Sequence, residues 1–353
     1  MSAIGTGPSA SARAEARAGA PVSPALTAVR ALEASVTDAT REAALACWPW
    51  VGRGQAHAAD AAATEAMRAA LARAPGKGVV VTGEGEKDEA PMLFTGERVG
   101  SGDGPDFELA VDPLECTDFC AAGLAGALAT IAVAEPGALW SPGPAFYMDK
   151  IVVSAPARAA IDIRDEPEVN LERVAAALGR RVEELRVVVL DKPRHEALIG
   201  RLRELGAAVS TPADGDVAGA LAALLPAGEA DVLMGIGGTP EGVMTACAAR
   251  ALGGGMEGRL APQRDDESAA LADAGVDIER RLTLDDLVRG EALFAATGVT
   301  GGSLLRGPWD TDDATWTESI VISPPGAARR VVEARDKRYV PEAPAPERRG
   351  TKS

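Results

Sequence analysis

Seven acidic side chains fall within two short segments that are rich in glycine and proline. TGEGEKDEAPM, residues 82–92, and AVDPLECTDF, residues 110–119, together contain Glu84, Glu86, Asp88, Glu89, Asp112, Glu115 and Asp118. Carboxylates this close together repel one another unless a positive group lies between them. A divalent metal cation is a natural candidate for that positive group.

The composition limits the classes of partner that we expect. The 353 residues include 52 acidic and 36 basic side chains, for a formal net charge of −16. Nucleic acid and anionic membrane surfaces are bound mainly through Lys and Arg, so neither is expected as a partner. With 46% hydrophobic residues the chain can bury a large core, and its length suggests two domains.

The cysteines and the N-terminal segment indicate a cytoplasmic protein. Cys47, Cys116, Cys120 and Cys247 form no CxxC pair and no ligand set with the two histidines, so neither a zinc site nor a disulfide framework is expected. No apolar run reaches the roughly 18 residues of a transmembrane helix. Residues 1–22 lack the continuous apolar region of a secretory signal, and we expect a disordered arm there.

Short strands are predicted to position the acidic segments. The β-branched run at 79–81 predicts a buried strand, with Glu84 just past its end. A second strand is predicted at 107–111, with Asp112 at its end before a helix-breaking proline. The runs 127–140 and 148–155 predict further strands of the same sheet.

Helical periodicity completes an alternation of strands and helices. Residues 24–48 and 58–74 have apolar side chains at helical spacing. Residues 180–216 predict strand, loop, helix and strand, and residues 230–254 predict a strand, a glycine turn and a helix with Glu241 in its first turn. This order is typical of an α/β fold. The partial positive charge at the start of that last helix suits a phosphate group.

The acidic segments carry a resemblance to a known family. Asp-Pro-Leu-Glu-Cys-Thr at 112–117 resembles the Asp-Pro-[Ile/Leu]-Asp/Glu-[Gly/Ser]-Thr signature of the metal-dependent, lithium-sensitive phosphatase superfamily. Between about Arg30 and Asp336 the chain is similar to class II fructose-1,6-bisphosphatase, on the segments GEGEKDEAPM, GPAFYMDKI, KPRHEAL, PADGDVA, GIGGTPEGV and FAATGVTGGSLL.

The resemblance implies a fold and an activity. The fold is a layered αβαβα sugar-phosphatase fold of the α/β (α+β) class. The activity is that of a phosphoric monoester hydrolase of carbohydrate metabolism, which removes the 1-phosphate of fructose 1,6-bisphosphate in a gluconeogenesis-type reaction that depends on Mg²⁺ or Mn²⁺. We expect a metal-binding phosphatase domain at 23–165, a sugar-phosphate-binding domain at 166–336, a loose tail at 337–353, and a homo-oligomer, either a dimer or a tetramer.

The resemblance also implies a role for individual residues. The implied metal ligands are Asp60, Glu84, Asp112, Glu115, Glu241 and the carbonyl oxygen of Leu114. The implied catalytic residues are Thr117, Glu84 and Asp88, with Thr117 and an acid such as Glu84 orienting a metal-bound water for in-line attack on phosphorus. The implied substrate-binding residues are Tyr147, Lys192, Arg194, Asp214, Asp216 and Gly238. Oxygen ligands favour Mg²⁺ or Mn²⁺ over zinc, and Lys and Arg suit phosphate oxygens.

Simpler interpretations exist for single residues. An acid after a strand is often a turn or helix-cap residue, although five acids in family register favour a site. Glu86 and Glu89 are expected to be solvated or supporting acids, and Lys192 to Arg194 could form a surface turn. His195 is expected to be a structural partner rather than an acid-base group.

Three positions depart from the family pattern and leave two alternatives open. Ala56 occupies a position where the family usually has lysine, with His57 beside it, and Cys116 replaces the Gly or Ser of the signature. Cys120 alters the run that follows. One alternative is a paralogue for another sugar or cyclitol phosphate, such as sedoheptulose 1,7-bisphosphate. The other is a catalytically weak regulatory or scaffold protein that binds sugar phosphates.

Overall fold

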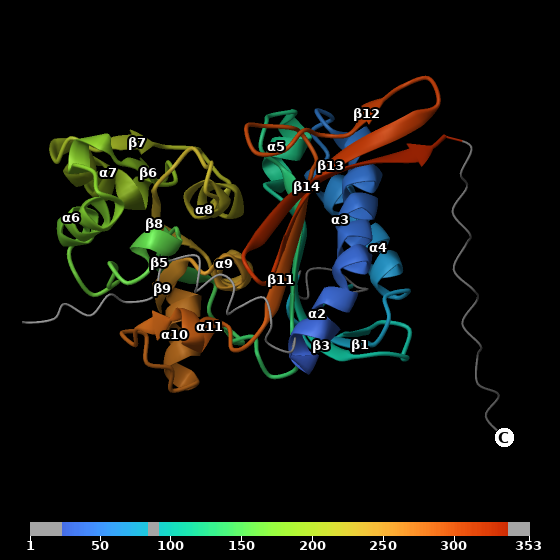
Figure 1. The fold of residues 1–353 in the computed structure, drawn as a ribbon, viewed down its shortest axis with the longest axis horizontal. Coiled ribbons are helices and arrows are strands. Elements are labelled where there is room, and N and C mark those ends of the chain that lie inside the picture. Colours follow the sequence, from blue (N-terminus) through green and yellow to red (C-terminus); the bar gives the residue numbers. More distant parts are fainter. Residues whose placement is uncertain (1–22, 84–91, 338–353) are drawn as a thin grey trace, which may run out of the picture.

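The strands pair into two sheets, which helices cover in layers (Figure 1). The computed structural model describes residues 23–83 and 92–337. The strands of the first sheet are β1 (Lys77–Thr82), β2 (Arg98–Val99), β3 (Asp106–Glu115), β4 (Leu128–Ala134), β11 (Ala292–Gly298), β12 (Trp309–Asp310), β13 (Ala314–Ser323) and β14 (Ala327–Asp336). They follow the order β12-β13-β11-β4-β3-β1-β2, and β14 pairs with β13.

The second sheet is built from the middle of the chain. Its strands are β5 (Tyr147–Val153), β6 (Arg186–Val188), β7 (Ala208–Ser210), β8 (Val232–Gly238), β9 (Gly255–Leu260) and β10 (Leu282–Thr283). They follow the order β10-β9-β5-β8-β6-β7. β5 pairs antiparallel with both β8 and β9, and β6 pairs parallel with β7 and β8.

Three layers of helices alternate with the two sheets. The outer face of the first sheet is covered by α2 (Pro24–Ala31), α3 (Glu33–Cys47) and α4 (Ala56–Leu71). Between the sheets lie α8 (Asp216–Leu224) and α9 (Thr239–Leu252), with the short α11 (Leu284–Leu287) beside them, and α6 (Pro167–Leu178) and α7 (Glu196–Glu204) cover the outer face of the second sheet. The short α5 (Thr117–Ala122) follows β3, and α10 (Asp265–Asp273) follows β9. The predicted αβαβα order is therefore confirmed.

The central layer explains the composition of α9. This helix packs against β3, β4 and β11 of the first sheet and against β5, β8 and β9 of the second. Its side chains Ala246, Ala248 and Ala249 are fully buried. Small side chains all round the helix let both sheets approach it closely, where an amphipathic helix would leave a polar face in the core. Figure 1 shows α9 between the two sheets.

Two strand predictions were wrong in detail. Residues 148–153 of the run 148–155 lie in β5 of the second sheet, whereas we expected the run in the same sheet as 127–140. The strand predicted at 107–111 continues through Asp112 and Pro113 to Glu115. Its pairing with β4 is irregular between Asp112 and Glu115, so the ladder does not require an N–H group from Pro113.

The strands do not divide between the sheets at one point of the chain. β5 lies before residue 165 and belongs to the second sheet, while β11 to β14 return to the first sheet after the second is complete. The division into 23–165 and 166–336 stays a prediction. The expected arm at 1–22 and the tail from residue 338 onward lie outside the described residues.

Cys116 has an unusual backbone conformation at the junction of β3 and α5. Its φ of 61° and ψ of 50° lie in the left-handed region, which residues other than glycine seldom adopt. Glycine has no Cβ and adopts this conformation without the steric cost. The superfamily signature that this segment resembles has Gly or Ser at this position. A cysteine here therefore has a backbone conformation that a glycine would adopt at a lower steric cost.

We expect Cys116→Gly to stabilise the protein. Relief of the left-handed strain is worth about 1–2 kcal/mol, and the added freedom of glycine in the unfolded chain offsets about half of this. The free energy of unfolding in urea should therefore rise by about 0.5–1 kcal/mol. Cys120→Gly is the matched control, since Cys120 is buried within α5, and it should destabilise. A Cys116→Gly protein less stable than wild type would contradict the strain argument.

Candidate active site

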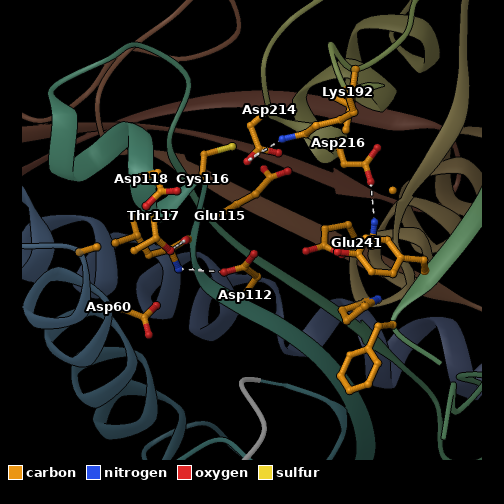
Figure 2. A pocket seen from close by; sticks show the side chains of 18 of the residues that line it. Asp60, Asp112, Glu115, Cys116, Thr117, Asp118, Lys192, Asp214, Asp216 and Glu241 are labelled. Atoms are coloured by element: carbon orange, nitrogen blue, oxygen red, sulfur yellow. Dashed lines mark hydrogen bonds and ion pairs between the residues drawn. The ribbon is translucent and has the colours of Figure 1, made fainter. Parts of the chain in front are cut away.

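Charged side chains from both sheets line one cavity of about 720 Å³. Asp112, Glu115 and Thr117 come from β3 and the start of α5, and Asp60 comes from α4. Figure 2 shows these side chains around a common space with Glu241 and Lys192. A cavity of this size can hold a small phosphorylated sugar.

The end of β3 fixes the acidic wall of the cavity. The Leu114 N–H donates to Oδ1 of Asp112 at 3.1 Å, and the Thr117 hydroxyl donates to the Leu114 carbonyl at 2.9 Å. The Thr130 hydroxyl of β4 donates to the Asp112 carbonyl at 3.2 Å. These local bonds hold the side chains of Asp112 and Thr117 toward the cavity at the junction of β3 and α5.

Glu115 is a buried carboxylate. It is 4% exposed, and its Oε1 accepts a hydrogen bond from the Val217 N–H at 2.8 Å. Oε2 has no hydrogen-bond partner among the residues that the structure describes. Burial raises the pKa of the Glu115 carboxyl well above its usual range, and the charges of Glu241, Asp216 and Asp214 raise it further.

Glu241 lies in the first turn of α9, as predicted, and faces the same cavity. Its Oε2 is likewise buried without a partner in the described part of the chain. Burial raises the pKa of Glu241, while the Lys150 ammonium acts in the opposite direction. Gly238 makes room for this side chain, because a Cβ at that position would lie 1.7 Å from Oε2 of Glu241.

Lys150 is a residue of this region whose role sequence reasoning missed. Its side chain is 0% exposed, and Nζ donates to Oδ2 of Asp216 at 2.5 Å and to the Gly238 carbonyl at 3.0 Å. Oδ2 of Asp216 also accepts from the Gly238 N–H at 3.1 Å, and a Cβ at Gly237 would collide with it. A lysine inside the apolar run of β5 was the available signal, because a buried lysine needs an acidic partner.

The expected sugar-phosphate residues lie together on the second sheet's side of the cavity. Arg194 donates to the Ile236 carbonyl at 2.9 Å and lies over the Tyr147 ring, with Cζ 5.3 Å from the centroid. Nζ of Lys192 is 3.9 Å from Oδ2 of Asp214. The structure thus brings all six predicted substrate-binding residues to the cavity, including Asp216 and Gly238.

His195 supports this wall from inside the protein. Its Nδ1 lies 2.8 Å from the Leu190 carbonyl, and its Nε2 accepts from the Ile236 N–H at 2.8 Å. This arrangement requires the neutral ring with the proton on Nδ1, and burial accordingly lowers the pKa of His195. The side chain is 2% exposed, in agreement with the expected structural role.

The departures from the family pattern lie at or near the cavity. Ala56 begins α4 and lines the cavity beside the exposed His57. The Cys116 side chain also lines the cavity, and burial raises the pKa of its thiol. Cys120 is a fully buried residue of α5 and is not among the residues that line the cavity. All four cysteines are free thiols.

The donor set fits a divalent cation, although its expected ligands are not all described. Glu84 and Asp88, with Glu86 and Glu89, lie outside the described residues. Among the described Asp, Glu, His and Cys side chains, no group of three lies close enough to hold a metal ion by itself. Oε2 of Glu115 and Oε2 of Glu241, which have no partner in the described segments, are nevertheless hard ligands that a cation would satisfy.

Comparisons with known proteins identify the family of the chain. A sequence profile of the family described as "Bacterial fructose-1,6-bisphosphatase, glpX-encoded" matches residues 30–336. The chain is 41% identical over 325 residues to the "Fructose-1,6-bisphosphatase class 2" of Haemophilus influenzae, which covers 88% of this chain and 97% of the relative. It is 42% identical over 307 residues to the "Fructose-1,6-bisphosphatase 1 class 2" of Escherichia coli K12, which covers 83% and 91%. The chain therefore belongs to the bacterial class 2 fructose-1,6-bisphosphatase family.

Proposed function

We propose that this protein is a metal-dependent phosphatase that removes the 1-phosphate of fructose 1,6-bisphosphate. The observation that carries the proposal is one cavity with two chemically different walls. Glu115 and Glu241 bring to one wall buried carboxylate oxygens that have no hydrogen-bond partner among the residues 23–83 and 92–337. Lys192 and Arg194 bring cations to the other. The first wall suits a reacting phosphate with metal ions, and the second suits a phosphate that stays on the sugar.

We propose that Mg²⁺ or Mn²⁺ is the resident cofactor. Asp60, Asp112, Glu115, Glu241 and the Leu114 carbonyl would hold it, and Glu84 completes the proposed set. When bound, divalent ions neutralise phosphoryl oxygens and make water a stronger nucleophile at neutral pH. Burial raises the pKa of Glu115 and of Glu241, because water stabilises a charged carboxylate poorly there. A bound cation would stabilise the same charges.

The chain's own groups orient the reactants. The Thr117 hydroxyl uses its hydrogen on the Leu114 carbonyl, so its oxygen lone pairs face outward and can accept a hydrogen bond from the attacking water. Lys192 and Arg194 bind the distal phosphate, and Asp214 and Asp216 accept hydrogen bonds from sugar hydroxyls. These contacts hold the substrate with one phosphate at the acidic wall.

Ala56 favours a second candidate function. A neutral side chain lines the cavity where the family usually has lysine, which suits a paralogue for another sugar bisphosphate or a weak enzyme with a regulatory role. Phosphate release from a panel of sugar phosphates with Mg²⁺ and with Mn²⁺ separates these candidates.

None of the helices in the described residues combines the length and the hydrophobicity that a membrane span needs. A cytoplasmic location and a dimeric or tetrameric state stay part of the proposal.

Removal of divalent ions should abolish activity and lower stability. Chelation leaves the buried carboxylates without a counter-charge, and cations at a hundredfold excess over their Kd should return about 2.7 kcal/mol. Phosphate release and the melting temperature, measured with chelator and after Mg²⁺ or Mn²⁺ is added back, report both effects.

Asp112→Ala tests the same site by mutation. It should lower kcat/KM by about a hundredfold or more, whereas Asp273→Ala, at an exposed acid on α10, should not. Full turnover in excess chelator, or in Asp112→Ala, would refute the metal-dependent mechanism.

Lys150→Met should destabilise the protein through Asp216. The change leaves a buried carboxylate without its cation, which typically costs about 3–5 kcal/mol. Adding Asp216→Asn removes that charge and should restore part of the loss in urea unfolding. Lys77→Met, at an exposed lysine on β1, should change stability by no more than about 0.5 kcal/mol. Equal effects of Lys150→Met and Lys77→Met would show that the buried pair is unimportant.

Ala56→Lys should raise activity if the missing cation limits turnover. One well-placed electrostatic contact contributes about 2–4 kcal/mol to transition-state stabilisation, or about 30-fold to several hundredfold in kcat. Ala58→Lys adds the same charge to the same turn of α4, at a side chain that does not line the cavity. A fall in kcat in Ala56→Lys would instead indicate that another group, with His57 the nearest, performs the lysine's role.

A further inference from the structure

Two consecutive aromatic residues at the start of β5 each lie under an arginine. Cζ of Arg264 is 4.4 Å from the centroid of the Phe146 ring, and Cζ of Arg194 is 5.3 Å from the centroid of the Tyr147 ring. All four side chains line the cavity. Phe146 is 54% exposed, so its ring adds little to a hydrophobic core and instead offers a face to the guanidinium.

A buried carboxylate fixes the position of this pair. Glu267 is 1% exposed, and its Oε1 accepts from the N–H groups of Phe146 at 2.6 Å and Tyr147 at 2.9 Å. Its Oε2 accepts from the Gln263 N–H at 3.0 Å. One side chain of α10 therefore ties the residue before Arg264 to the two aromatic residues.

Arg264 differs from Arg194 in how its guanidinium is held. Arg194 directs two N–H groups to the Ile236 carbonyl. Arg264 lies on a ring face, and a ring face attracts a guanidinium without using its in-plane N–H donors. Its acidic neighbour Asp266, at 3.4 Å, has a side chain that is 73% exposed, so solvent screens that ion pair.

We propose that Arg264, held on Phe146, is a specificity-determining residue that binds the non-reacting phosphate of a sugar bisphosphate. A planar guanidinium matches two phosphate oxygens at once, and two arginines that line one cavity suit a dianion better than one. The proposal rests on the function proposed above and adds to it a residue that reads the second phosphate. A substrate without that phosphate gains nothing from Arg264.

The test compares Arg264→Gln with wild type on three ligands in the presence of Mg²⁺. Fructose 1,6-bisphosphate carries both phosphates, fructose 6-phosphate carries the distal one, and fructose 1-phosphate carries the reacting one. For the bisphosphate, KM should rise about ten- to a hundredfold with kcat little changed. Calorimetric titration should show a similar loss of affinity for fructose 6-phosphate and an unchanged affinity for fructose 1-phosphate.

Two further variants separate this role from a structural one. Arg289→Gln removes an exposed arginine that does not line the cavity and should match wild type on all three ligands. Phe146→Leu keeps an apolar side chain but removes the ring face, and it should raise KM for the bisphosphate by a smaller factor than Arg264→Gln does.

The titrations distinguish failure of the inference from failure of the proposed function. If wild type hydrolyses the bisphosphate and Arg264→Gln leaves its KM unchanged, or weakens all three ligands equally, the inference is wrong and the proposed function stands. If wild type hydrolyses none of the sugar phosphates, the proposed function is wrong. In that case the affinity of wild type and of Arg264→Gln for fructose 6-phosphate still tests the role of Arg264. A wild-type protein that binds none of the three ligands refutes both the proposed function and the inference.

Discussion

Negative charge buried where the two sheets meet is the constraint on which the site depends. Glu115 ends β3 of the first sheet and Glu241 lies in the first turn of α9, in the layer between the sheets, yet each raises the electrostatic energy of the other. Lys150 offers one internal cation, which Asp216 engages. The charge of the other buried carboxyls is costly by itself, and burial raises their pKa for that reason.

The layered fold is what brings the two kinds of charge to one cavity. β3 ends in Asp112 and Glu115 at the first sheet, and the loops of the second sheet present Lys192 and Arg194. α9 lies between the sheets, and its first turn places Glu241 at their junction. Since small residues let both sheets pack on this helix, the packing of the core sets the distance between the two sheets that carry these walls.

Local patterns predicted the parts of the structure that depend on neighbours in sequence. The strand and helix around Glu241 follow from an apolar run, glycines and a proline in succession. The sheet to which β5 belongs depends on partners far along the chain, which periodicity cannot reveal. The burial of Lys150 has a local signal, since the lysine lies within an apolar run, but its partner Asp216 is 66 residues away and could not be identified. The left-handed backbone of Cys116 has no signature in residue type.

The return of β11 to β14 to the first sheet has a consequence for the order in which the protein forms during synthesis. β4 carries an unpaired edge until β11, more than 150 residues later, is available to cover it, as the pairing of Ile131 with Ala295 illustrates. The ribosome therefore delivers the acidic wall and the whole second sheet before the first sheet can close. A nascent chain stopped before residue 292 would hold both walls of the cavity and expose an apolar strand edge to other chains.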